Sequence, residues 1–181
     1  PELKQSLEAG VNKAKWYPFD QFVELNVVLD RLFGAGDGKL IKVLGRYGAD
    51  AVTLNPYLGR DSAQPFLDRA DKGVVLLCRT SNPGAKDFQD LDCGGKPLYQ
   101  RVAESIARDW NGNGNCLLVT GATWPQELAS VRAIVGDMPF LVPGVGAQGG
   151  DVAAVVANGK TADGGGLLVS SSRAILYAGN G

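Results

Sequence analysis

Short apolar runs, separated by glycine-rich and polar stretches, recur along this chain at the spacing of buried strands. Several runs are continuously apolar and rich in β-branched residues, which is typical of parallel strands that are covered on both faces. The pattern predicts strands over residues 23–29, 51–54, 73–78, 116–120, 140–142 and 166–169.

The segments between these runs carry helical signals. Val102, Ile106 and Trp110 recur every four residues and form one apolar stripe. Pro125 suits the first turn of a helix, with Thr123 as its N-cap. Helices are expected over residues 98–110, 125–134 and 151–157.

Strand, loop and helix in repeated succession indicate βαβ units. This alternation fits both a β/α barrel and an open doubly wound sheet. The chain shows no internal repeat and no linker, so we expect one domain over residues 1–181. A complete eight-stranded barrel rarely has fewer than about 200 residues. We therefore expect that part of a barrel is absent from the 181-residue sequence.

Composition narrows the possible functions. The chain has 18 Lys and Arg against 19 Asp and Glu, which argues against a nucleic-acid binder, since such proteins carry a basic stripe. No apolar run approaches the ~20 residues that span a bilayer. Histidine is absent, which excludes a Ser-His-Asp triad. The three cysteines lack paired metal-ligand spacing and are expected to be reduced cytoplasmic thiols, with Cys78 and Cys116 in the core.

Two strands run into loops that suit phosphate binding. Residues 141–150 pass from an apolar strand into a glycine-rich turn and a helix start, where the backbone and its free N–H groups can approach an anion. The strand at 166–169 ends in serines and Arg173, which can clamp a phosphate. In β/α barrels, the loops after strands seven and eight commonly form a shared phosphate site. Simple turns, a helix cap and a surface salt bridge at Arg173 are the alternatives.

A third strand also ends in small polar residues. Residues 75–85 lead from an apolar run into Ser81 and a Pro-Gly turn. The hydroxyl and amide of Ser81 could hydrogen-bond the edge of a planar base, although an ordinary turn is an equally simple interpretation.

Taken together, these motifs resemble one enzyme family. Residues 143–150, the Ser-Ser-Arg sequence that ends at Arg173, and residues 79–84 are similar to the bacterial type 2 branch of orotidine 5'-monophosphate decarboxylase. The similarity extends over roughly residues 48–177. It also includes residues 49–59, 111–114 and 119–123.

The resemblance implies a (β/α)8 TIM barrel that converts orotidine 5'-monophosphate to uridine 5'-monophosphate in pyrimidine biosynthesis. It implies a cytoplasmic homodimer that uses no metal and no organic cofactor. Gln148 and Arg173 would hold the 5'-phosphate. The backbone around Gly149 and Ser172 would help them. Ser81 would read the pyrimidine edge, and the loop at Pro143 would close over the base. Carried over by position, the substrate-binding residues are therefore Ser81, Pro143, Gln148, Gly149, Ser172 and Arg173.

The sequence departs from this family at the residues that perform the chemistry. The family carries an Asp-x-Lys-x-x-Asp motif after an early strand, and residues 27–30 resemble that strand. Asp30 is then the remaining catalytic carboxylate, but Leu32 stands where the protonating lysine belongs. We expect residues to be missing between Asp30 and Arg31.

Two other functions stay open. One is a catalytically inactive relic that binds nucleoside monophosphates. The other is a barrel decarboxylase for a phosphorylated sugar, against which the motifs at residues 55–57 and 79–82 count.

Overall fold

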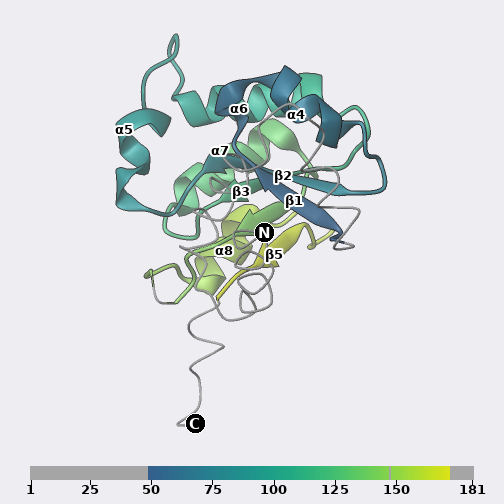
Figure 1. Cartoon of the computed structure of the whole chain (residues 1–181). Coiled ribbons are helices and arrows are strands. Elements are labelled where there is room, and N and C mark those ends of the chain that lie inside the picture. The colour runs from purple at the N-terminus through teal and green to yellow at the C-terminus, as the bar shows by residue number, and fades with distance from the viewer. Residues whose placement is uncertain (1–48, 147, 172–181) are drawn as a thin grey trace, which may run out of the picture.

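The structure is a computed structural model that describes residues 49–146 and 148–171 (Figure 1). The predicted strand at 23–29 and the candidate residues Asp30, Ser172 and Arg173 lie outside the described residues. The strands are β1 (Ala51–Leu54), β2 (Gly73–Arg79), β3 (Cys116–Thr120), β4 (Phe140–Val142) and β5 (Leu167–Val169). The α-helices are α4 (Arg60–Leu67), α5 (Lys86–Gln89), α6 (Leu98–Ser105), α7 (Pro125–Val135) and α8 (Val152–Gly159). The 3-10 turns are η2 (Pro56–Leu58) and η3 (Pro83–Ala85), and η4 (Ile106–Trp110) is a π-helical turn.

The strand order decides between the two architectures that the sequence left open. All neighbouring strands are parallel, and the order β1-β2-β3-β4-β5 follows the chain. A doubly wound sheet reverses its order at a switch point, and its helices cover both faces. Here α6 packs against α7 and α7 against α8, so these helices form one layer. The described strands are therefore an arc of a β/α barrel, which is the predicted fold class.

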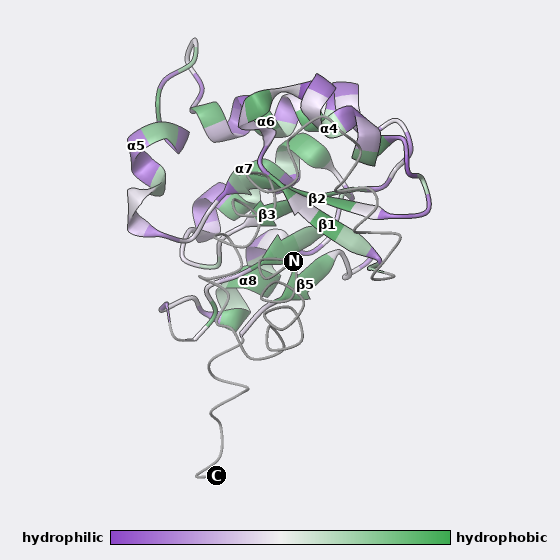
Figure 2. Cartoon of the chain, in the orientation of Figure 1, coloured by the Kyte–Doolittle hydropathy of each residue, from purple (hydrophilic) through white to green (hydrophobic). Residues whose placement is uncertain are grey.

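The core lies between the strands and this helical layer. Val74, Leu76, Leu118 and Phe140 alternate along their strands and are fully buried. Figure 2 shows the hydrophobic residues concentrated in the strands and on the helix faces toward them. Each such side chain contributes about 1.5–3 kcal/mol through burial. Their partners in the helices include Ala103, Ile106, Leu128, Val131 and Val155.

Most of the predicted elements agree with the structure. Strands β1, β3 and β4 have the predicted bounds, β2 extends one residue further and β5 begins one residue later. The apolar stripe is confirmed, because Ile106 is fully buried while Val102 and Trp110 pack against the core. The last residues of this predicted helix form the π-helical turn η4, and Asn111 accordingly donates its N–H to the carbonyl of Ile106.

The predicted N-cap of α7 is wrong. Trp124 occupies the cap position, and its side chain makes no cap hydrogen bond to the helix. The hydroxyl of Thr123 instead donates to the carbonyl oxygen of Ser81 at 3.2 Å. The Thr123 side chain thus joins the loops after β2 and β3.

Helices α4 and α5 were not predicted. Helix α4 contains Pro65, which in a sequence signals the end of a helix, and α5 has only four residues. None of the described helices is long and apolar enough to cross a membrane.

Arg132 of α7 joins several chain segments at the N-terminal ends of β4 and β5. Its guanidinium donates to the carbonyl oxygens of Gly159 at 2.8 Å and Met138 at 2.7 Å, and also to those of Gly136 and Gly166. It lies 3.8 Å from the centre of the Phe140 ring. Burial lowers the pKa of Arg132, and Asp137 opposes this effect. The cation thus caps the carbonyl ends of α7 and α8.

Replacing Arg132 by methionine should lower the free energy of unfolding by about 2–3 kcal/mol, because several carbonyls lose a charged donor. Urea denaturation would measure the loss. Arg108→Met is the control, since this exposed arginine pairs, within the part of the chain that the structure describes, with its neighbour Asp109 alone. That variant should stay within about 0.5 kcal/mol of the parent. Similar losses in both variants would contradict the role of Arg132.

Candidate active site

A pocket of about 600 Å³ opens at the C-terminal ends of β2, β3 and β4. Enzymes with the β/α barrel fold place their active sites at this end of the strands. Among the described lining residues, Lys86 is the only charged one, and no carboxylate is present. This charge pattern favours an anionic ligand. The described lining consists of Ser81, Asn82, Pro83, Lys86, Thr123, Trp124 and Gln148.

Ser81 lies in the loop after β2, and the loop after β3 supports it. The carbonyl of Ser81 accepts the Thr123 hydroxyl, and the Gly121 N–H donates to the carbonyl of Arg79 at 2.7 Å. A Cβ atom on Gly121 would lie 2.7 Å from both Cα and N of Ser81, so only glycine permits this approach. Among the described residues, neither the amide nor the hydroxyl of Ser81 has a hydrogen-bond partner. The described residues therefore leave both groups to a ligand.

Gln148 lies in a tight loop after β4. Gly144, Gly146 and Gly149 have positive φ angles of 93°, 76° and 86°, which strongly favour glycine. The N–H of Gly150 donates to the carbonyl of Gly144 at 3.0 Å and closes the loop. A Cβ atom on Gly144 would lie 2.9 Å from both Gln148 Oε1 and Ser81 Cβ. The two predicted binding residues therefore flank the same glycine and share one pocket.

Pro143 and Gly149 belong to the same loop but do not line the described pocket. Pro143 is buried, and its carbonyl accepts the N–H of Ala122 at 2.8 Å, which ties the loops after β3 and β4 together. Gly149 is exposed, and its N–H donates to Gly146 at 2.8 Å. Their predicted contacts with substrate stay predictions.

The loops after β4 and β5 also meet. The hydroxyl of Ser171 donates to the carbonyl oxygen of Val145 at 3.1 Å. The N–H of Ser170 donates to the carbonyl oxygen of Val142 at 3.0 Å. These contacts bring the chain just before Ser172 and Arg173 to the loop that carries Gln148. The roles of Ser172, Arg173 and Asp30 stay predictions, because these residues lie outside the described residues.

Sequence reasoning did not select Asn82, Lys86, Thr123 or Trp124 as part of the site. Thr123 and Trp124 follow β3 directly, so the rule that binding residues follow barrel strands could have found them. The same rule applies to Asn82, which lies in the loop after β2, whereas Lys86 is the first residue of α5 and no local pattern marks it.

The sequence also matches a known family. Residues 38–181 match the family described as "Orotidine 5'-phosphate decarboxylase / HUMPS family". The chain belongs to this family. The family match begins at residue 38, whereas the resemblance in the motifs begins at about residue 48.

Curated relatives carry the same name. The chain is 62% identical over 141 residues to the orotidine 5'-phosphate decarboxylase of Azoarcus sp. (strain BH72), covering 78% of this chain and 52% of that protein. It is 53% identical over 181 residues to the enzyme of Cellvibrio japonicus (strain Ueda107), covering 98% of this chain and 66% of that protein. The chain thus spans between about half and two thirds of these relatives.

Solved structures of the family have a similar fold. The structure of Leishmania donovani OMP decarboxylase superposes with a TM-score of 0.72 at 44% identity, covering 76% of this chain and 53% of that chain. The enzyme from Methanocaldococcus jannaschii, solved in complex with the inhibitor BMP, gives a TM-score of 0.62 at 26% identity. The superposition covers 78% of this chain and 60% of that chain. The five-stranded arc is therefore part of the orotidine 5'-phosphate decarboxylase barrel.

Gly121→Ala should destabilise this family member by about 1–3 kcal/mol, because the new methyl group would push into the backbone of Ser81. Denaturant unfolding would measure the change. Gly112→Ala is the matched control, since a Cβ there meets nothing within 4 Å. An equal effect in both variants would show that the close approach to Ser81 does not restrict position 121 to glycine.

Burial raises the pKa of Cys78 to about 12 and that of Cys116 to about 11. Both thiols therefore stay protonated at mildly alkaline pH, and thiolate forms only as the pH approaches these values. We expect a disulfide reagent to modify Cys93 in the native protein and all three cysteines after denaturation. Rapid native modification of Cys78 or Cys116 would contradict their place in the core.

Proposed function

We propose that the pocket binds orotidine 5'-monophosphate and that the protein decarboxylates it to uridine 5'-monophosphate in pyrimidine biosynthesis. The observation that carries this proposal is the meeting of Ser81 and Gln148 at Gly144. Membership of the orotidine 5'-phosphate decarboxylase family and the cationic lining of the pocket support it.

Each predicted residue has a role in this proposal. Ser81 offers a hydroxyl and an amide that match the donors and acceptors on the edge of a pyrimidine. Gln148 and Arg173 hold the phosphate with the backbone of Gly149 and Ser172. The loop that begins at Pro143 closes over the base, and no metal or organic cofactor is needed.

The chemical step requires more than binding. Loss of CO2 leaves negative charge on a pyrimidine carbon, and a positioned cation must stabilise this charge and supply a proton. Asp30 is the proposed carboxylate beside the substrate. Leu32 stands where the family has its lysine. This observation favours a second candidate, a protein that binds the nucleotide without turnover.

We also propose that the protein acts as a cytoplasmic homodimer. The resemblance to the family supports the dimer. The cysteines, all three free, suit a reducing compartment.

Two assays on the full chain separate the candidates. Calorimetry would measure affinity for uridine 5'-monophosphate, and loss of orotidine 5'-monophosphate absorbance would measure turnover. Binding with turnover supports the decarboxylase, and binding without turnover supports the second candidate. The absence of binding would contradict both.

Gln148→Ala should raise the Kd for uridine 5'-monophosphate by about tenfold while leaving that for uridine within about twofold, because only the phosphate contact is lost. Ser81→Ala should weaken both ligands. Gln126→Ala, an exposed glutamine outside the pocket, is the control for Gln148. Equal weakening of both ligands in Gln148→Ala would contradict its assignment to the phosphate.

A further inference from the structure

Arg79 ends β2 at an irregularity in the sheet. In the register with β3, Leu77 pairs with Val119 and Arg79 pairs with Thr120, so β2 carries one extra residue, Cys78. Successive side chains of a regular strand point to opposite faces. Here both Cys78 and Arg79 contact Tyr99 of α6, through a thiol hydrogen bond of 3.3 Å and a guanidinium 5.6 Å from the ring centre. The bulge thus turns Arg79 out of the barrel interior toward the helices.

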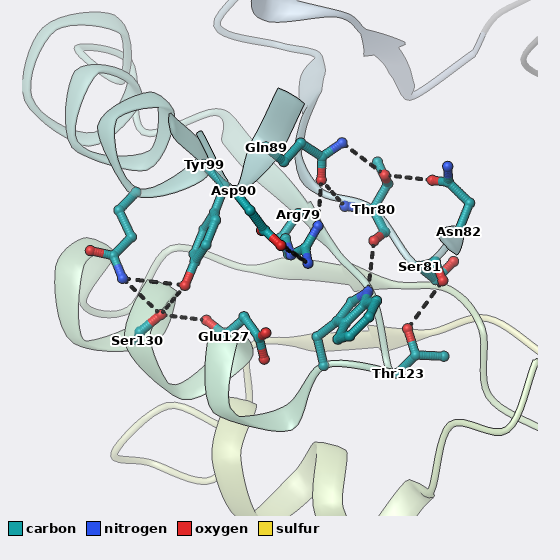
Figure 3. A network of polar contacts seen from close by, with 12 residues as sticks. Arg79, Thr80, Ser81, Asn82, Gln89, Asp90, Tyr99, Thr123, Glu127 and Ser130 are labelled. Carbon is teal, nitrogen blue, oxygen red and sulfur yellow. Dashed lines mark hydrogen bonds and ion pairs between the residues drawn. The ribbon is translucent and has the colours of Figure 1, made fainter. Parts of the chain in front are cut away.

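The guanidinium of Arg79 is completely buried, and Figure 3 shows its polar contacts. It forms an ion pair with Asp90 at 3.1 Å and lies 4.6 Å from the centre of the Trp124 ring. Its Nε has no hydrogen-bond partner among the described residues. A buried ion pair is a weak source of stability, and apolar side chains of similar volume often stabilise as much. Stability alone therefore does not account for an arginine here.

Arg79 orients the side chain of Gln89, which in turn binds Thr80. The Gln89 oxygen Oε1 accepts from Arg79 Nη1 at 3.3 Å and from the Thr80 N–H at 2.9 Å. The cation favours this orientation of the amide, so the Gln89 nitrogen Nε2 faces the Thr80 hydroxyl and donates to it at 2.9 Å. Through Gln89, the buried charge determines the position of Thr80.

Trp124 holds Thr80 from the other side. Its indole N–H donates to the Thr80 carbonyl at 3.1 Å, and its ring is stacked by Arg79 and by Lys86, whose Nζ lies 4.8 Å from the ring centre. The Thr80 hydroxyl in turn donates to Asn82 Oδ1 at 2.7 Å. Every polar group of Thr80 is therefore engaged, and the two residues that follow it line the pocket.

We propose that Arg79 is a positioning residue for base recognition, which orients the hydroxyl and amide of Ser81 through Gln89, Trp124 and Thr80. Arg79 does not line the pocket, so it acts only through these neighbours. The inference rests on the proposed function, in which Ser81 reads the pyrimidine edge.

The test compares a ligand that has the base with one that lacks it. Affinities of the full chain for uridine 5'-monophosphate and for ribose 5-phosphate are measured by calorimetry and competition. Arg79→Met should raise the Kd for the nucleotide by about tenfold and leave that for ribose 5-phosphate within about twofold. Equal weakening of both ligands, or no weakening, would overturn the proposal.

A double variant tests whether Arg79 acts through Ser81. If it does, the loss of affinity for uridine 5'-monophosphate in Arg79→Met combined with Ser81→Ala should be clearly smaller than the sum of the two single losses, because the hydroxyl that Arg79 orients is already gone and only the amide of residue 81 remains. Additive losses would mean that Arg79 affects affinity by another route. Arg132→Met is the matched control, because it removes a different guanidinium at the other end of the strands and should leave both affinities unchanged.

Gln89→Leu covers the case in which Arg79→Met does not fold. It keeps the ion pair of Arg79 with Asp90 and removes the bonds of Gln89 to Thr80 and to Arg79, so it should show the same selective loss for the nucleotide. Unchanged affinity in this variant would overturn the proposal.

Amide hydrogen exchange without ligand distinguishes failure of this inference from failure of the proposed function. The Thr80 amide should exchange faster in Arg79→Met and in Gln89→Leu than in the parent protein. If the Thr80 amide exchanges faster in the variants but the parent protein binds no nucleotide, the proposed function is refuted while the positioning of Thr80 by Arg79 still holds. Unchanged exchange would refute the role of Arg79 itself.

Discussion

The pocket depends on three loops whose backbones pack directly against one another. A Cβ atom would lie 2.7 Å from Ser81 Cα at Gly121, 2.9 Å from Ser81 Cβ at Gly144 and 2.4 Å from Ala122 Cβ at Gly150. Distances this short exclude any side chain. The parallel strands bring the loops to the same end of the sheet, and glycine lets them approach closely enough for Ser81 and Gln148 to line one pocket.

Two arginines, Arg132 and Arg79, bind neighbouring groups at opposite ends of the strands. Arg132, before β4 and β5, donates to backbone carbonyls and joins α7 to α8. Arg79, at the C-terminal end of β2, pairs with Asp90 and Gln89 beside the pocket. A guanidinium suits both tasks because its planar fork of donors is rigid and its charge persists when it is buried.

The apolar pattern was sufficient to predict much of the barrel wall. Strands β1, β3 and β4 agree with their predicted bounds because buried parallel strands are continuous apolar runs. Helix α4 was missed because Pro65 breaks the helical pattern, and it forms because Ala63, Phe66 and Leu67 pack against the strands. The Thr123 cap was wrong because the helix begins one residue later than a Thr123 cap requires, with Trp124 at the cap position, and the Thr123 hydroxyl bonds to the Ser81 carbonyl from a distant loop.

By itself, the sequence determined the alternation of strands and helices, the glycine-rich loops and the residues Ser81 and Gln148 that follow their strands. These features depend on local spacing, which residue order encodes directly. Only the tertiary structure decided that the strands follow chain order in a barrel arc, that Ser81 and Gln148 meet at Gly144, and that Arg79 turns outward to Gln89 and Trp124. Each of these depends on contacts between distant segments and on one bulge in β2, and such contacts follow from packing and not from local pattern.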